Sequence, residues 1–185
     1  MKHIQLNNND IKGLTQKICR EIHLAEWRPD YIIGITRGGL IPAVMLSHWL
    51  NVPMYTLKIS LRDGKHNESI EWMSKNAIGY CEQNSLDDTE FLLDRQTCKN
   101  ILIVDDINDS GSTFNWLIDN WQSTCCPTEI AAWHTIWNNN VKFAVLVNNI
   151  TSNFRVNIDF FGLEVSRAKE DFWIDFPWET WWTND

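Results

Sequence analysis

The chain has 185 residues, of which 44% are hydrophobic and 22% charged, with a formal net charge of −8. This length and composition fit one globular domain, residues 1–185, with a substantial core. The acidic balance disfavours nucleic-acid binding, because phosphate backbones need clustered Lys and Arg. No apolar run is long enough for a transmembrane helix. Five cysteines without a CxxC pair, and an N-terminus without a signal-peptide core, favour a reducing cytoplasm.

The first third of the chain predicts a helix and then a strand–helix–strand unit. Apolar residues fall on one face over residues 10–26, which predicts a helix capped by Asn9 or Asp10. A buried strand is expected at 31–35, a helix at 40–50 and a second strand at 53–59. This order implies parallel pairing and a right-handed crossover.

A tight loop, Thr36-Arg37-Gly38-Gly39, joins the first strand to the helix. Its two glycines allow close backbone approach, and the following helix N-terminus favours anions. Arg37 adds a charged donor. The loop therefore suits a phosphate-rich ligand, and a plain glycine turn is the alternative.

Residues 60–98 are polar and predict a long irregular loop, of a kind that is usually functional or disordered. Arg62, Lys65 and Lys75 are candidate anion contacts in this segment. For each of them a solvated surface position is the competing interpretation.

Residues 101–113 carry the most specific pattern. The apolar run Ile101 to Val104 predicts a buried strand, Asp105 and Asp106 stand at its end, and small residues lead into a helix at 114–122. A small-residue loop at a helix N-terminus can bind phosphate, and paired carboxylates can bind a vicinal diol or Mg²⁺. The combination suggests a ribose 5-phosphate site. The alternative is an acid pair beside a helix cap.

Further strands are expected at 141–147, which Asn148 and Asn149 follow, and at 156–160. An aromatic segment, Asp171-Phe-Trp-Ile-Asp-Phe-Pro-Trp-Glu179, comes near the C-terminus. The alternation of strands and helices predicts an α/β fold, a doubly wound parallel sheet with ligands at the carboxyl ends of its strands.

Residues 101–113, 36–43 and 171–179 together resemble type I phosphoribosyltransferases, and most closely their xanthine-guanine (purine) branch. The resemblance implies a small hood formed by the C-terminal residues 150–185 and inserted segments, and a loop at 60–98 over the active site. It also implies 5-phosphoribosyl 1-pyrophosphate (PRPP) and a nucleobase as substrates, Mg²⁺ as cofactor, and a homo-oligomer, dimer or tetramer.

The resemblance also assigns roles to residues. Asp105 and Asp106 would contact the ribose and Mg²⁺, and Asp109, Ser110, Gly111, Ser112 and Thr113 would hold the 5-phosphate. Residues Thr36 to Gly39 would bind pyrophosphate, with a cis bond between Thr36 and Arg37. Asp109 would be either a general acid/base or a loop cap. Trp173 would stack on the base, and Ile174 would present backbone groups to it. Purine enzymes place a lysine near the end of the strand at 141–147; the closest residues here are Asn148 and Asn149, and the amide of Asn149 could contact the base instead.

The expected reaction is transfer of phosphoribosyl from PRPP to a nucleobase, a 6-oxopurine, with release of pyrophosphate in nucleotide salvage. Two alternatives stay open because the lysine is missing. One is a regulatory protein that binds PRPP or a nucleotide without turnover. The other is an enzyme for a non-purine acceptor.

Overall fold

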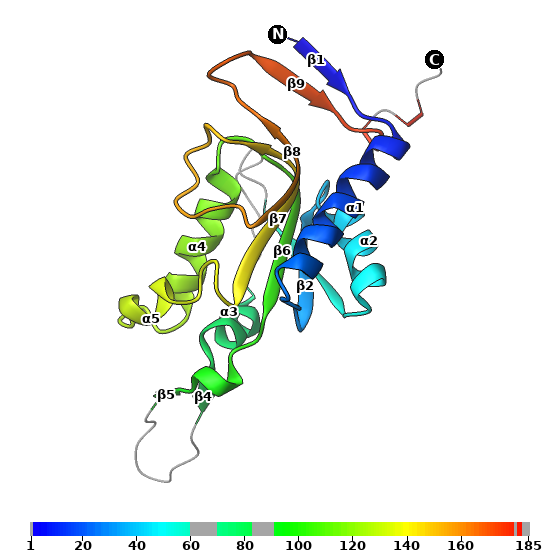
Figure 1. Ribbon diagram of the computed structural model, residues 1–185. Coiled ribbons are helices and arrows are strands. Elements are labelled where there is room, and N and C mark those ends of the chain that lie inside the picture. The colour runs from blue at the N-terminus through cyan, green and yellow to red at the C-terminus, as the bar shows by residue number, and fades with distance from the viewer. Residues whose placement is uncertain (1, 60–69, 83–90, 180, 183–185) are drawn as a thin grey trace.

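The computed structural model describes residues 2–59, 70–82, 91–179 and 181–182 of the chain (Figure 1). Its centre is a sheet of five parallel strands in the order β3-β2-β6-β7-β8. The strands of this sheet are β2 (Tyr31–Thr36), β3 (Met54–Lys58), β6 (Ile101–Asn108), β7 (Val141–Asn149) and β8 (Phe160–Val165). The predicted doubly wound parallel sheet is confirmed.

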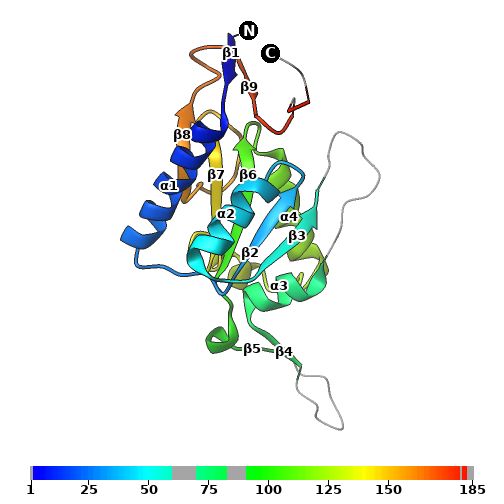
Figure 2. The same cartoon turned by 90° about the vertical axis from the view of Figure 1, so that its right-hand side faces the viewer.

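Helices cover both faces of the sheet (Figures 1 and 2). One face carries α1 (Asn8–Leu24) and α2 (Leu40–Leu50), and the other carries α3 (Glu71–Ile78), α4 (Ser112–Thr124) and α5 (Ile130–His134). None of the helices in the described part of the chain is long and apolar enough to cross a membrane.

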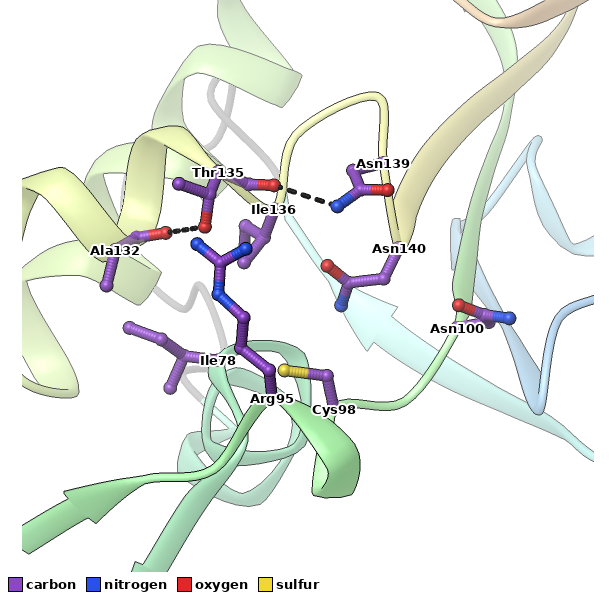
Figure 3. A pocket seen from close by; sticks show the side chains of 9 residues that line it. All are labelled: Ile78, Arg95, Cys98, Asn100, Ala132, Thr135, Ile136, Asn139 and Asn140. Atoms are coloured by element: carbon purple, nitrogen blue, oxygen red, sulfur yellow. Dashed lines mark hydrogen bonds between the residues drawn. The ribbon is translucent and has the colours of Figure 1, made fainter.

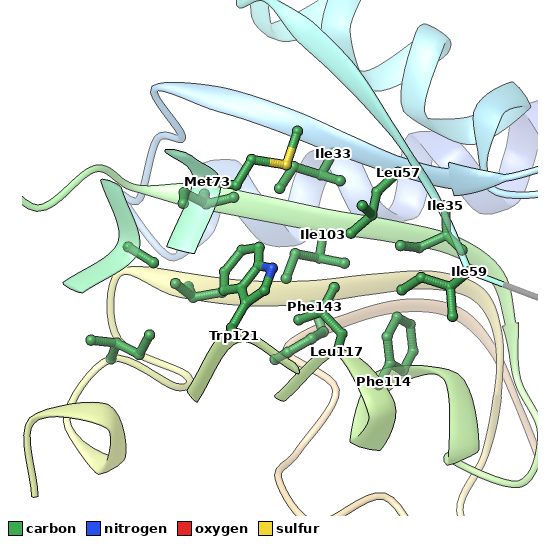
Figure 4. Close-up of a cluster of buried hydrophobic side chains, with 14 of the residues drawn as sticks. Ile33, Ile35, Leu57, Ile59, Met73, Ile103, Phe114, Leu117, Trp121 and Phe143 are labelled. Atoms are coloured by element: carbon green, nitrogen blue, oxygen red, sulfur yellow. The ribbon is translucent and has the colours of Figure 1, made fainter. Parts of the chain in front are cut away.

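Alternating side chains of the central strands supply two separate cores. Ile33 and Ile103 point toward α3 and α4, where they meet Trp121 and Phe143 (Figure 4). The neighbouring Ile32 and Leu102 point toward α1 and α2. Burial on both faces explains why these strands are continuously apolar in sequence.

A second, two-stranded sheet lies beyond the main one. It pairs β1 (Lys2–Gln5) in parallel with β9 (Phe172–Asp175), and Figures 1 and 2 place it past the end of β8. Lys2 and Glu170 form an ion pair beside it, as do His3 and Asp175. The N-terminal residues therefore hold the aromatic C-terminal segment in place.

Several predicted boundaries were wrong. The first helix begins at Asn8, because Asn7 accepts hydrogen bonds from the backbone of Asn9 and Asp10 while the Asp10 carboxylate accepts one from Asn7. The strand expected at 156–160 begins only at Phe160. The Asp159 carboxylate instead accepts hydrogen bonds from Phe143 and Asn138, which holds the preceding residues in a loop.

The segment 70–98 was also predicted wrongly as part of one irregular loop. It contains α3, the short strands β4 (Tyr80–Glu82) and β5 (Phe91–Leu93), and the 3₁₀ turn η1 (Arg95–Thr97). Its helix packs near the amino ends of the main strands, since Asn76 and Ala77 contact Lys99, Tyr31 and Asn140. Lys75 thus lies at the edge opposite the acid pair, whereas Arg62 and Lys65 fall outside the described residues.

Candidate active site

An acidic pair stands in the second half of β6, which continues to Asn108 rather than ending at the pair. The Asp105 carboxylate accepts a hydrogen bond of 2.9 Å from the backbone N–H of Asp106. Burial, together with the neighbouring Asp106, raises the pKa of Asp105 well above its usual value. Burial also raises the pKa of Asp106 to about 6, and Glu179 contributes in the same direction. Both carboxyls thus carry an electrostatic cost that a diol or a cation would relieve.

The glycine loop after β2 lies directly against this pair. The backbone N–H of Gly39 bonds to Asp105. A Cβ on Gly39 would come within 2.5 Å of the Val104 carbonyl oxygen, and one on Gly38 would overlap the Asp106 carboxylate. A side chain at Gly39 is excluded by backbone atoms, whereas one at Gly38 would have to displace the Asp106 carboxylate. The Thr36–Arg37 peptide is cis, as predicted.

A second loop, Asp109 to Gly111, connects β6 to the N-terminus of α4. Gly111 has φ +84°, and a side chain there would meet the Phe154 backbone, with Cα 2.7 Å away. The hydroxyl groups of Ser110 and Ser112 lie 2.9 Å apart. Hydroxyl groups and the backbone N–H groups at the start of α4 make this loop a suitable cradle for one phosphate group.

Arg167, which the sequence did not single out, pairs with the first residue of that loop. Its Nε and Nη2 atoms donate to both oxygens of the Asp109 carboxylate, at 2.5 and 3.0 Å. Its Nη1 atom donates to Asp171 and to the Phe172 carbonyl, and its guanidinium stacks on the Phe172 ring at 4.5 Å. The hydrogen bond to Asp109 raises the pKa of Arg167, so the guanidinium stays charged.

Asn149 lies at the end of β7 and is only 3% exposed. Its amide group donates to the Asp109 carbonyl at 2.8 Å. Its side-chain oxygen accepts hydrogen bonds from both N–H and hydroxyl of Thr151 and from the Arg167 backbone. These contacts leave the side chain facing the protein, which argues against the predicted contact with a base. Asn149 instead holds Asp109 and Arg167 together.

The aromatic segment contributes Trp173, which stands on β9 with 38% of its surface exposed, and Ile174, which is buried. Trp173 follows directly after Phe172, the residue on which Arg167 stacks. Arg167 therefore connects the predicted base-binding segment to the loop from Asp109 to Gly111. Its neighbours Phe176 and Trp178 stack on one another, at 4.8 Å between ring centroids.

Metal binding can be judged from the same residues. Among the side chains that the structure describes, no group of three or more His, Cys, Asp or Glu is arranged to hold an ion. Mg²⁺ commonly uses one or two carboxylates and completes its shell with water and substrate phosphates. Asp105 and Asp106 fit that mode of binding.

A separate cavity of about 310 Å³ lies at the opposite edge of the sheet, between η1 and α5 (Figure 3). Arg95 projects into it beside Thr135 and Asn140. The Asn140 amide donates to the Ala77 and Lys99 carbonyls, so this side chain braces neighbouring segments. The cavity therefore plays no part in the arrangement around the acid pair.

The acid pair, the glycine loop and the loop from Asp109 to Gly111 lie at the carboxyl ends of parallel strands, where open α/β sheets bind their ligands. This arrangement defines an α/β protein with a candidate ligand site at one edge of its parallel sheet. The family model for the phosphoribosyl transferase domain matches residues 2–181, and the chain belongs to that family.

Individual relatives agree with this assignment. The chain is 29% identical over 126 residues to xanthine phosphoribosyltransferase 1 of Saccharomyces cerevisiae, covering 63% of this chain and 59% of the relative. It is 28% identical over 127 residues to the hypoxanthine-guanine phosphoribosyltransferase of Schizosaccharomyces pombe, covering 60% and 55%. The chain thus spans less than two thirds of the length of these relatives.

The fold itself matches a solved structure. The purine phosphoribosyltransferase of Pyrococcus horikoshii superposes with a TM-score of 0.61 at 24% identity. The match covers 100% of this chain and 99% of that one. At this identity the likeness concerns the fold alone.

Proposed function

We propose that the protein transfers the 5-phosphoribosyl group of PRPP to a nucleobase, a 6-oxopurine, and releases pyrophosphate. The observation that carries this proposal is the contact between the glycine loop and the acid pair. A group bound at Gly38 and Gly39 lies beside one bound at Asp105 and Asp106. This is the arrangement needed for a ribose with a pyrophosphate at C1. The matches to purine enzymes support the choice of acceptor.

The proposed division of labour follows from the positions of the loops. Residues 109–113 hold the 5-phosphate, and residues 36–39 hold the departing pyrophosphate. Binding both ends of the donor fixes its C1 atom, so that remote binding energy positions the reacting centre. Mg²⁺ bound near Asp105 and Asp106 would supply neutralising charge for the pyrophosphate as it leaves.

Trp173 and Ile174 are the proposed base contacts. The exposed indole of Trp173 offers a flat apolar face to a planar ring, and the backbone of Ile174 offers hydrogen-bonding groups to its edge. Asn149 serves this site indirectly, by fixing Asp109 and Arg167.

Asp109 had two expected roles, general acid/base or loop cap. Its carboxylate is held at both oxygens by Arg167. Accepting a proton would require that pair to open, so the geometry favours the role of organising the loop.

The test is pyrophosphate release from PRPP and Mg²⁺ with guanine, hypoxanthine, xanthine, adenine, uracil, orotate and nicotinate offered separately. We expect release with an oxopurine, and loss of release in Asp105→Asn/Asp106→Asn. Release only with adenine, uracil, orotate or nicotinate would overturn the choice of a 6-oxopurine as the acceptor. PRPP binding without turnover on any base would overturn the enzyme proposal in favour of a sensor. The homo-oligomer remains a prediction, which sedimentation velocity tests.

A further inference from the structure

The ion pair between Asp109 and Arg167 involves the first residue of the segment 109–113, the proposed phosphate loop. Asp109 immediately precedes Ser110, whose hydroxyl bonds to that of Ser112. Its side chain is 39% exposed, and that of Arg167 is 32% exposed. If the loop binds the 5-phosphate as proposed, a partly exposed carboxylate stands at its first residue, next to a dianion.

A lone carboxylate in this position would repel phosphate. Repulsion between like charges is stronger in a partly desolvated environment than in bulk water. The guanidinium of Arg167 cancels that charge, because it pairs with both oxygens of Asp109. No other cation lies within ion-pair distance of Asp109 among the described residues.

Other contacts keep Arg167 in place when no ligand is bound. Its Nη1 atom is held by Asp171 and by the Phe172 carbonyl, and its backbone N–H donates to Asn149. The Phe172 ring covers one face of the guanidinium. The cation is therefore oriented in advance, which lowers the entropic cost of using it.

We propose that Arg167 is a positioning residue that neutralises Asp109 and thereby permits the phosphate loop to bind the 5-phosphate of the sugar. The inference rests on the proposed function for the identity of the sugar phosphate. Arg167 would thus affect the affinity for the phosphoribosyl donor, although it lies in the segment that leads to the proposed base-binding strand.

The experiment measures ribose 5-phosphate binding by calorimetry, without a nucleobase, to wild type, to three variants of the ion pair and to one control variant. Arg167→Gln leaves the carboxylate uncompensated, and we expect binding about ten-fold weaker, equivalent to about 1.4 kcal/mol. Arg167→Lys keeps the charge and should bind within about three-fold of wild type. Asp109→Asn/Arg167→Gln removes both charges and should recover most of the lost affinity.

The double variant separates electrostatics from structure. If Arg167 only braced the loop, removing both partners would leave binding as weak as in Arg167→Gln, and that result would overturn the proposal. Salt provides a second criterion, because the defect of Arg167→Gln should shrink as ionic strength rises. Arg20→Gln, an exposed position on α1, controls for the change in net charge.

Failure of this inference can be told from failure of the proposed function. Turnover by the wild-type protein tests the function, whereas ribose 5-phosphate affinity across the variants tests Arg167. Equal affinity of wild type and Arg167→Gln, or no binding to wild type, would overturn the inference whatever the turnover assay gives.

Discussion

Gly38 lies so close to Asp106 that a methyl group on this glycine would overlap the carboxylate. Gly38→Ala should therefore displace the acid pair without removing any functional side chain. We expect kcat/KM for PRPP to fall by about 100-fold, because an error of about 1 Å in a reacting geometry has that effect. Steady-state pyrophosphate release measures it.

Gly13→Ala is the matched control, since a Cβ there meets nothing within 4 Å on the exposed face of α1. It should leave kcat/KM unchanged and stabilise the fold by about 0.5–1 kcal/mol, because alanine favours a helix interior. Full activity in Gly38→Ala would show that the loop and the acid pair act independently.

The acid pair should make the free energy of unfolding depend on pH. The pKa of Asp106 is about 6 in the folded protein and 3.8 in the unfolded chain, so the folded state binds the proton more tightly. The free energy of unfolding therefore falls as pH rises between these two values. Above pH 6 the full cost of ionising Asp106 in the folded protein is present. Asp106→Asn should thus stabilise the protein by about 1–2 kcal/mol at pH 7.5.

Urea unfolding at pH 4 and pH 7.5 tests this expectation. The advantage of Asp106→Asn should be small at pH 4, where the wild-type carboxyl is largely protonated when folded. The same difference at both pH values would mean that packing, rather than ionisation, separates the variants.

Asn149 should matter for stability as well as for the site. Asn149→Ala leaves the Asp109 carbonyl and the N–H groups of Thr151 and Arg167 without this partner. We expect a loss of about 2–3 kcal/mol, because unsatisfied buried groups cost about 1–3 kcal/mol each and water replaces part of the loss. Thermal unfolding reports the change.

Asn139→Ala provides the comparison for that variant. Asn139 is exposed and makes one side-chain hydrogen bond, to the Thr135 carbonyl. Its replacement should change stability by less than about 0.5 kcal/mol. Equal effects at the two positions would contradict the bracing role of Asn149.

Trp173→Leu should weaken binding of the acceptor and leave the donor unaffected. Stacking of a base on an aromatic side chain contributes about 1–3 kcal/mol, so KM for the base should rise by about ten- to hundred-fold. Trp182→Leu, which alters a side chain that is 64% exposed, is the matched control. An equal rise in KM for PRPP would place Trp173 outside the base site.

The parts of the site that could be predicted from sequence are those built from consecutive residues. Residues 101–113 form a strand, a loop and the start of a helix that follow one another directly. The spacing of these residues in the sequence therefore predicts their arrangement in space. The same holds for the loop from Thr36 to Gly39. In both places, glycines stand where the structure leaves no room for a side chain.

The contacts of Arg167 with Asp109, Asp171 and Phe172 could not be predicted in this way. The contact with Asp109 joins loops 58 positions apart, and no periodicity marks a residue that pairs across two loops. The helix α3 was missed for a different reason. Its buried face contains Ser74 beside Met73 and Ala77, so a polar residue interrupts the apolar spacing that would have revealed it.

The pairing of β1 with β9 joins residues as far apart as His3 and Asp175, which are 172 positions apart. Contacts between residues so far apart close long loops, and the chain loses the entropy of loop closure before the contacts stabilise it. We therefore expect this small sheet to form last during folding. It should also be the first to fray, since it lies outside the main sheet. Hydrogen exchange at residues 172–175 would then report an opening of the proposed base-binding segment, while protection of the strands that carry the acid pair stays unchanged.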